Sequence, residues 1–358
     1  MNASNFFKDE VVLELAGVLA GPLAGRFFAE HGAKVIKVEN PHAGGDVTRG
    51  WYTKEEDPHG ISAYYASVNQ GKEARMIDLK TEIGRHELGL LLQNATILLT
   101  NFRPVDFERF NLSFEAIRLR FPKLIIGQID GFGRDNNRPA YDMVLQAESG
   151  FLSMSGTQDG TLVKMPVALI DVLAGQHLKT GILMAMLNRE RTGQGSLVRV
   201  SLLDAALTSL VNQSAAFLKT SQVPKPMGTL HPSIAPYGEC FETADGKKFV
   251  IAVGSDAQFD TLLGLVGLEK LRVEGAFRLN KQRVDNRAVL FDTLSPCFQL
   301  DSRENWMKLF LENGIPAGAI YSLDEVFSQK EIESLLVKSH QEGEELISVK
   351  ISPLFFEE

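Results

Sequence analysis

Short apolar runs alternate with amphipathic stretches through the first half of the chain. Runs rich in leucine and β-branched residues predict buried strands over residues 11–15, 34–38, 76–79, 96–100 and 124–128. Between these runs, apolar residues spaced three and four apart predict helices over 22–30, 84–93 and 114–121. Because strands that alternate with helices form βαβ units, the pattern predicts an α/β fold with a mostly parallel sheet.

The second half of the chain has a different pattern of predicted elements. Further helices are predicted over 142–153, 172–189 and 203–218, with a strand over 196–201. Four prolines then fall within residues 221–236, which is typical of a linker between domains. Beyond it, Asp245-Gly246 predicts the turn of a hairpin, and helices are predicted over 257–266 and 303–312. We therefore expect a large domain over 1–220, a linker and small α+β domain over 221–330, and a segment of about 330–358 that returns to the large domain.

The composition is that of a globular protein, with 44% hydrophobic and 23% charged residues among 358. The net charge of -8 and the lack of a basic stripe argue against a nucleic-acid partner. No apolar run reaches membrane-spanning length, and the N-terminal stretch carries acids, so we expect a cytoplasmic protein without membrane contact. Cys240 and Cys297 are far apart and in no CxxC pair, which excludes a thiolate metal site and fits a reducing compartment.

The first predicted βαβ unit suggests a nicotinamide oxidoreductase as one alternative. Glu39 ends the second strand where a ribose-binding acid would lie. However, Gly17, Gly21 and Gly25 are spaced four apart, whereas a dinucleotide turn needs G-x-G-x-x-G. Glycines at this spacing more often allow a helix to pack closely on a sheet. The chain also has no phosphate loop, no G-x-S-x-G elbow and no metalloprotease histidine pair.

Seven strings of residues follow one another along nearly the whole chain. They are LAGVLAGPLAGRFFAEHGAKVIKVE with GGDVTRGW, NQGKEARMIDLK, NFRP, GFGRDNNRPAYDMVLQAESG, DVLAGQHLKTGILMAMLNRERTGQG, HPSIAPYGECFETADG and NGIPAGAI. In content and order they resemble the family III CoA-transferases, the CaiB/BaiF family of formyl-CoA and carnitine CoA-transferases. The resemblance implies a Rossmann-like large domain, a smaller α+β domain, and a homodimer whose two chains are interlinked as rings.

The resemblance also implies a binding site for coenzyme A. By matching position, its residues are Val18, Ala20, Lys80, Asn101, Phe102, Arg109 and Tyr141. A cation and a flat apolar side chain suit the phosphates and adenine of CoA. Taken singly, Lys72, Arg75 and Lys80 could equally be ordinary solvated charges, and the role of Arg49 stays open in the same way.

Asp171 matches the family's catalytic aspartate, which attacks an acyl-CoA thioester and carries CoA as a covalent thioester. From the residues alone, an aspartate before a long apolar helix is more often an N-cap. The implied reaction exchanges one thioester for another between acyl-CoA and a carboxylic acid, so it requires neither ATP nor a metal.

Two other functions stay open within the same resemblance. The family's racemases use a histidine where this chain has Tyr141, which is a far weaker base near neutral pH. A CoA-binding homologue without turnover is the other, although Asp171 is intact. Leu19 stands where the formate/oxalate branch has glutamine, which favours an acyl group less polar than that of oxalate.

Overall fold

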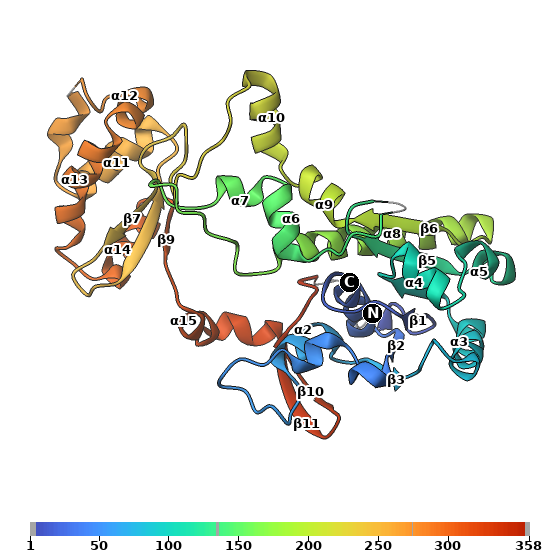
Figure 1. Cartoon of the computed structure of the whole chain (residues 1–358). Coiled ribbons are helices and arrows are strands. Elements are labelled where there is room, and N and C mark those ends of the chain that lie inside the picture. The colour runs from blue at the N-terminus through green and yellow to red at the C-terminus, as the bar shows by residue number, and fades with distance from the viewer. Residues whose placement is uncertain (1–4, 134–135, 274, 355–358) are drawn as a thin grey trace. The chain divides into compact units, whose positions relative to one another are not determined.

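The computed structural model describes residues 5–133, 136–273 and 275–354 of the chain, so Arg134 and Asp135 of the GFGRDNN string lie outside it. Contacts within the chain define two compact units (Figure 1). The first comprises Met1–Ser153, Lys164–Pro224 and Ser334–Glu358. The second comprises Met154–Val163 and Lys225–Glu333.

A six-stranded parallel sheet forms the centre of the first unit. Its strands, in the order β3-β2-β1-β4-β5-β6, are β1 (Val11–Glu14), β2 (Lys34–Glu39), β3 (Glu73–Met76), β4 (Ile97–Thr100), β5 (Ile125–Asp130) and β6 (Leu197–Ser201). The predicted parallel α/β sheet is confirmed. The strand order reverses between β1 and β4, where the chain crosses from one half of the sheet to the other.

The strands are buried on both faces because neighbouring side chains point to opposite sides. Val12, Leu99 and Ile125 belong to a core with α1 (Ala20–Glu30) and α8 (Leu169–Thr192). Leu13, Leu98 and Ile126 belong to a second core with α3 (Glu82–Asn94) and α5 (Phe114–Arg120). Helices therefore cover both faces of the sheet, which leaves its carboxyl edge for the loops.

The shorter helices of this unit differ in part from the prediction. They are α2 (Ala63–Asn69), α4 (Pro104–Arg109), α6 (Asp142–Glu148), α7 (Phe151–Met154), α9 (Leu202–Thr208) and α10 (Val211–Thr220). The single helices predicted over 142–153 and 203–218 are each divided. Gly150 has a φ of 93° between α6 and α7, and Val211 has a φ of 33° at the start of α10. Both values lie outside the helical range, so neither of the two predicted helices can run unbroken through its whole predicted range.

The second unit is built on three antiparallel strands, β7 (Tyr237–Glu242), β8 (Lys248–Ala252) and β9 (Ala317–Ala319). The predicted hairpin is confirmed, with Gly246 at a φ of 70° in the turn between β7 and β8. Phe249, Phe298 and Phe310 lie in its core. Its helices are α11 (Asp256–Leu265), α12 (Asn280–Asp285), α13 (Arg287–Phe298), α14 (Arg303–Glu312) and α15 (Leu323–Phe327).

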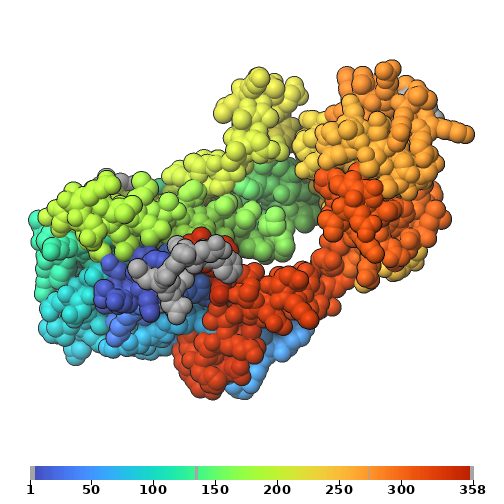
Figure 2. Space-filling model, turned by 180° about the vertical axis from the view of Figure 1, so that it is seen from behind, coloured from blue at the N-terminus to red at the C-terminus, as the bar shows by residue number. Residues whose placement is uncertain are grey.

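A final hairpin, β10 (Leu336–Gln341) and β11 (Glu344–Val349), belongs to the first unit. Gln70 Nε2 donates to Ser339 Oγ at 2.5 Å, and Arg26 Nη2 donates to Ser348 Oγ at 2.7 Å. Figure 2 shows this hairpin in red against the blue segment that contains α2. Within the described residues, no helix is both long and apolar enough to cross a membrane.

Candidate active site

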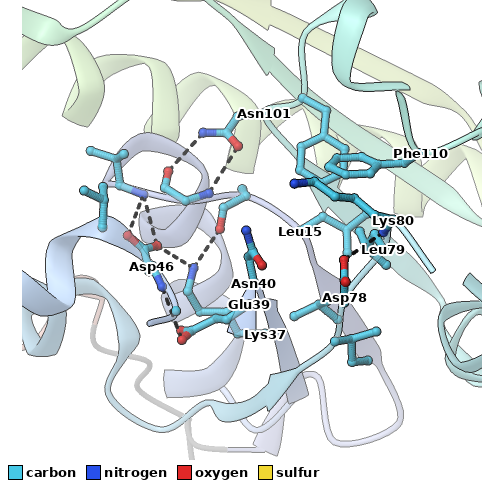
Figure 3. Close-up of a pocket in the computed structure, with 18 residues that line it drawn as sticks. Leu15, Lys37, Glu39, Asn40, Asp46, Asp78, Leu79, Lys80, Asn101 and Phe110 are labelled. Atoms are coloured by element: carbon cyan, nitrogen blue, oxygen red, sulfur yellow. Dashed lines mark hydrogen bonds and ion pairs between the residues drawn. The ribbon is translucent and has the colours of Figure 1, made fainter. Parts of the chain in front are cut away.

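Two cavities lie along the edge where the parallel strands end. The first has a volume of about 300 Å³ and is lined by residues that follow β1, β2, β3 and β4 (Figure 3). The second has a volume of about 340 Å³ and includes Tyr141 and Asp171. Gly17, Val18 and Asn101 line both cavities. These three residues follow β1 and β4, where the strand order reverses, and open α/β sheets bind ligands at this position.

Asp171 is a buried acid in the second cavity. It lies in the first turn of α8 and is only 7% exposed. Among the residues that the structure describes, its carboxylate has no hydrogen-bond partner. Burial, and then the charge of Asp142, raise the pKa of Asp171 to about 7. The carboxylate is therefore poorly solvated and more basic than an ordinary aspartate, as a nucleophile should be.

The N-terminus of α8 is capped by Asp142, not by Asp171. Asp142 Oδ1 accepts hydrogen bonds from the backbone nitrogens of Ile170 at 2.7 Å and Asp171 at 3.3 Å. Gln146 Nε2 donates to the other oxygen, Asp142 Oδ2, at 2.6 Å. The cap thus comes from the neighbouring helix α6. The alternative in which Asp171 serves only as a helix cap does not fit this geometry.

The turn between β1 and α1 separates the two cavities. Gly17 N donates to Asn101 Oδ1 at 3.2 Å, and Asn101 Nδ2 donates back to Gly17 O at 3.0 Å. Val18 has a φ of 71°, and its N–H donates to Asp46 Oδ2 at 3.1 Å. Figure 3 shows Asn101 on one side of this turn and Asp46 on the other. Side chains from two separate loops therefore fix its backbone.

The far side of the first cavity combines a cation with aromatic surface. Lys80 is exposed, and its backbone N–H donates to Asp78 Oδ1 at 2.9 Å. The rings of Phe102 and Phe110 lie 5.1 Å apart and both line the cavity. Figure 3 places Lys80 and Phe110 together, opposite Asp46. The arrangement suits a ligand that carries both phosphate and a flat base.

The residues of the first cavity do not favour a dinucleotide. Glu39 accepts from Arg49 Nε at 2.6 Å and from Tyr65 Oη at 2.7 Å, so its carboxylate is already engaged by the protein.

No histidine lines either cavity among the described residues. In that same part of the chain, no group of three or more histidine, cysteine or acidic side chains is placed to hold a metal ion.

The family model for CoA-transferase family III matches residues 7–358 of this chain. This chain belongs to CoA-transferase family III. It is 34% identical over 341 residues to the succinate–glutarate CoA-transferase of Agrobacterium fabrum, covering 93% of this chain and 84% of that protein. It is 31% identical over 340 residues to the acetyl-CoA:oxalate CoA-transferase of Acetobacter aceti, covering 93% and 86%. A CaiB/BaiF family protein from Brucella suis has a similar structure, with a TM-score of 0.87, 32% identity and coverage of 99% and 93%.

Most of the residues expected to bind CoA in this CoA-transferase lie at the two cavities. Val18 and Asn101 line both of them, and Lys80 and Phe102 line the first. Ala20, Tyr141 and Asp171 line the second. Arg109 lines neither cavity and is exposed in the last turn of α4. Its role in CoA binding stays a prediction from the resemblance.

Sequence reasoning missed several polar residues of the cavities. Arg103 and Arg138 line the second cavity, and Asp46 and Lys37 line the first. The two arginines stand within the NFRP and GFGRDNNRP strings, which could have singled them out. Lys37 and Lys72 are almost fully buried, which rules out the interpretation of Lys72 as a solvated charge.

Proposed function

We propose that this CoA-transferase moves CoA from an acyl-CoA to a dicarboxylic acid through a thioester on Asp171. The supporting observation is the state of Asp171 itself. It is buried, it has no hydrogen-bond partner among the described residues, and it lines a cavity that adjoins the first cavity at Val18 and Asn101. A structural carboxylate would be expected to accept hydrogen bonds in such a place.

The reaction begins when a carboxylate oxygen of Asp171 attacks the carbonyl carbon of the acyl-CoA. The C–S bond breaks, CoA leaves as a thiolate, and a mixed anhydride forms. The thiolate then attacks the aspartyl carbonyl, which expels the donor carboxylate and leaves CoA joined to Asp171. The acceptor carboxylate attacks this thioester, the same two steps run in reverse, and Asp171 is released as a carboxylate.

The two cavities suit the two ends of an acyl-CoA. Lys80 and Phe102 in the first cavity supply a cation and an aromatic surface for the nucleotide end. Gly17, Val18 and Asn101, which border both cavities, suit passage of the narrow pantetheine arm toward Asp171. The Lys80 and Asp171 ends of the site thus correspond to the charged and reacting ends of the substrate.

The proposed substrate class is a dicarboxylic acid. The names of the two relatives above include three dicarboxylates, succinate, glutarate and oxalate, and the second name also includes acetyl-CoA. Arg103 and Arg138 line the cavity of Asp171 and bring two guanidinium groups to it. Each also forms an ion pair within the chain, with Asp106 and Glu148 respectively, so a second substrate carboxylate would share them with these acids. Leu19 adds an apolar surface to the same cavity, which favours succinate or glutarate, with their methylene groups, over oxalate.

We further propose that the enzyme is an interlinked homodimer and that it is cytoplasmic. The dimer rests on the family resemblance and on the return of β10 and β11 to the first unit after the chain has built the second. The location rests on Cys240 and Cys297, which are both free thiols, as in proteins of a reducing compartment.

The function is tested by mixing the enzyme with succinyl-CoA and, separately, glutarate, oxalate or acetate. Mass spectrometry of the CoA esters should find glutaryl-CoA formed fastest and acetyl-CoA slowest. Exchange that favours acetate would contradict the dicarboxylate assignment, and no exchange with any donor in a wider panel of acyl-CoAs would contradict transfer.

A further inference from the structure

A chain of four buried charged side chains lies next to the turn between β1 and α1. Lys72 Nζ is 2.8 Å from Glu14 Oε2, Glu14 Oε1 is 3.1 Å from Lys37 Nζ, and Lys37 Nζ is 3.0 Å from Asp46 Oδ2. All four side chains are at most 2% exposed. The cluster contains two acids and two bases, so its charges compensate one another, as buried charges must.

Asp46 is the last member of this chain of charges and contacts the turn between β1 and α1. Its carboxylate accepts from Val18 N at 3.1 Å, from Thr48 N at 3.0 Å and from Thr48 Oγ1 at 2.9 Å, besides Lys37. Burial acts to raise the pKa of Asp46, but the Lys37 charge and the hydrogen bonds from Thr48 and Lys37 lower it below the usual value. Asp46 is therefore a carboxylate with four donors around two oxygens.

The backbone that Asp46 holds is strained. A φ of 71° at Val18 is in the left-handed region, which a β-branched residue rarely enters. Such a conformation persists only where the surroundings enforce it. The contacts that enforce it are the Asp46 carboxylate at Val18 N and the paired hydrogen bonds of Asn101 at Gly17 (Figure 3).

This turn determines where the neighbouring parts of the site lie. Gly17 and Val18 line both cavities, and the next two residues, Leu19 and Ala20, line the cavity of Asp171. If Val18 relaxed to a negative φ, the start of α1 would move relative to Asp171. Shifts of about 1 Å in a reacting site can lower a rate about a hundredfold.

We propose that Asp46 is a positioning residue for CoA transfer: held in place by its ion pair with Lys37, it fixes Val18 in the left-handed conformation that aligns the two cavities. This inference rests on the proposed function, because it concerns the same reaction at Asp171. Asp46 acts on the reaction through the backbone of Val18, and all four of its donors come from the protein.

The test is Asp46→Asn, assayed for transfer from succinyl-CoA to glutarate. An amide of the same shape has one acceptor oxygen, so in either orientation its NH₂ group meets a donor from Val18, Thr48 or Lys37. We expect kcat to fall 10- to 100-fold while KM for succinyl-CoA changes less than threefold. The matched control is Glu10→Gln, which breaks the 2.5 Å ion pair with Arg189 just before β1, at the opposite edge of the sheet. It should keep kcat within twofold.

A second variant separates positioning from simple stability. Glycine adopts a positive φ without strain, so adding Val18→Gly to Asp46→Asn should raise kcat at least threefold, or restore folding if the single variant does not fold. Wild-type kcat in Asp46→Asn, or no recovery in the double variant, would overturn the inference. If the wild type and Glu10→Gln show no exchange either, the proposed function fails instead.

Discussion

Asp171 should give the enzyme a characteristic dependence on pH. Its pKa is raised to about 7, first by burial and then by Asp142. Only the carboxylate can attack a thioester, so kcat/KM should rise as the pH increases through about 7 and level off above it. Asp142→Asn keeps an oxygen to cap α8 but removes the negative charge.

The charge removed in Asp142→Asn disfavoured the ionised form of Asp171, so its removal should lower the pKa of Asp171. The rising limb of the profile should therefore move to lower pH in this variant, as measured by kcat/KM between pH 5 and 9. An unchanged limb would show that Asp171 does not control it.

A single lysine should account for much of the electrostatic binding of CoA. Lys80 is exposed in the first cavity, so Lys80→Ala should cost about 1.5–3 kcal/mol of CoA affinity, the range for hydrogen bonds to charged groups. The loss should shrink at high salt. Calorimetry on Lys123→Ala, an exposed lysine before β5, provides the control for net charge. Arg109→Ala should have a smaller effect than Lys80→Ala, and the reverse order would place Arg109 at the phosphates.

Site residues were predictable from the sequence only where a motif marked them. Asp171, Val18 and Asn101 were found by resemblance, and all three line the cavities. The buried ion pairs of Lys72 and Lys37 were not found, because burial of a charge depends on partners distant in sequence. Glu14 and Lys72 are 58 residues apart and meet only when β1, α1 and α2 pack together.

At the scale of elements, the hydrophobic pattern predicted where strands occur more accurately than it predicted the residues at which they begin and end. β3 covers Glu73–Met76 instead of 76–79, because Ile77 and Leu79 are buried apolar residues that follow the paired strand. The hairpin of β10 and β11 was not predicted. Its side chains are mostly half-buried or exposed, so an apolar alternation is weak there.

The glycines of α1 lead to a stability test between two helices. A Cβ at Gly25 would lie 1.8 Å from Glu14 Oε2, whereas a Cβ at Gly89 in α3 would meet nothing within 4 Å. The Glu14 carboxylate is held by Lys37 and Lys72 and cannot simply move aside, so Gly25→Ala should lower the free energy of unfolding by several kcal/mol. Gly89→Ala should raise it by up to about 1 kcal/mol, through helix propensity. Urea denaturation measures both, and equal effects would contradict close packing of α1 on β1.

For the whole molecule, the proposed interlinked dimer predicts an unusual response to dilution. Interlinked chains cannot separate without unfolding, so light scattering should detect only dimers down to the lowest measurable concentration. Denaturant should dissociate and unfold the protein in a single step. A folded monomer that appears on dilution alone would contradict interlinking, although it would leave the chemistry of Asp171 unaffected.

The central claim is that Asp171 carries CoA as a covalent thioester. The most direct measurement is to mix the enzyme with succinyl-CoA, quench the reaction, digest the protein and determine peptide masses. The wild type should show a CoA-sized adduct on the peptide that contains Asp171, and hydroxylamine should remove it. Asp171→Asn, which is nearly isosteric, should show neither adduct nor transfer. Full transfer by the Asn variant, with no adduct in the wild type, would contradict the account.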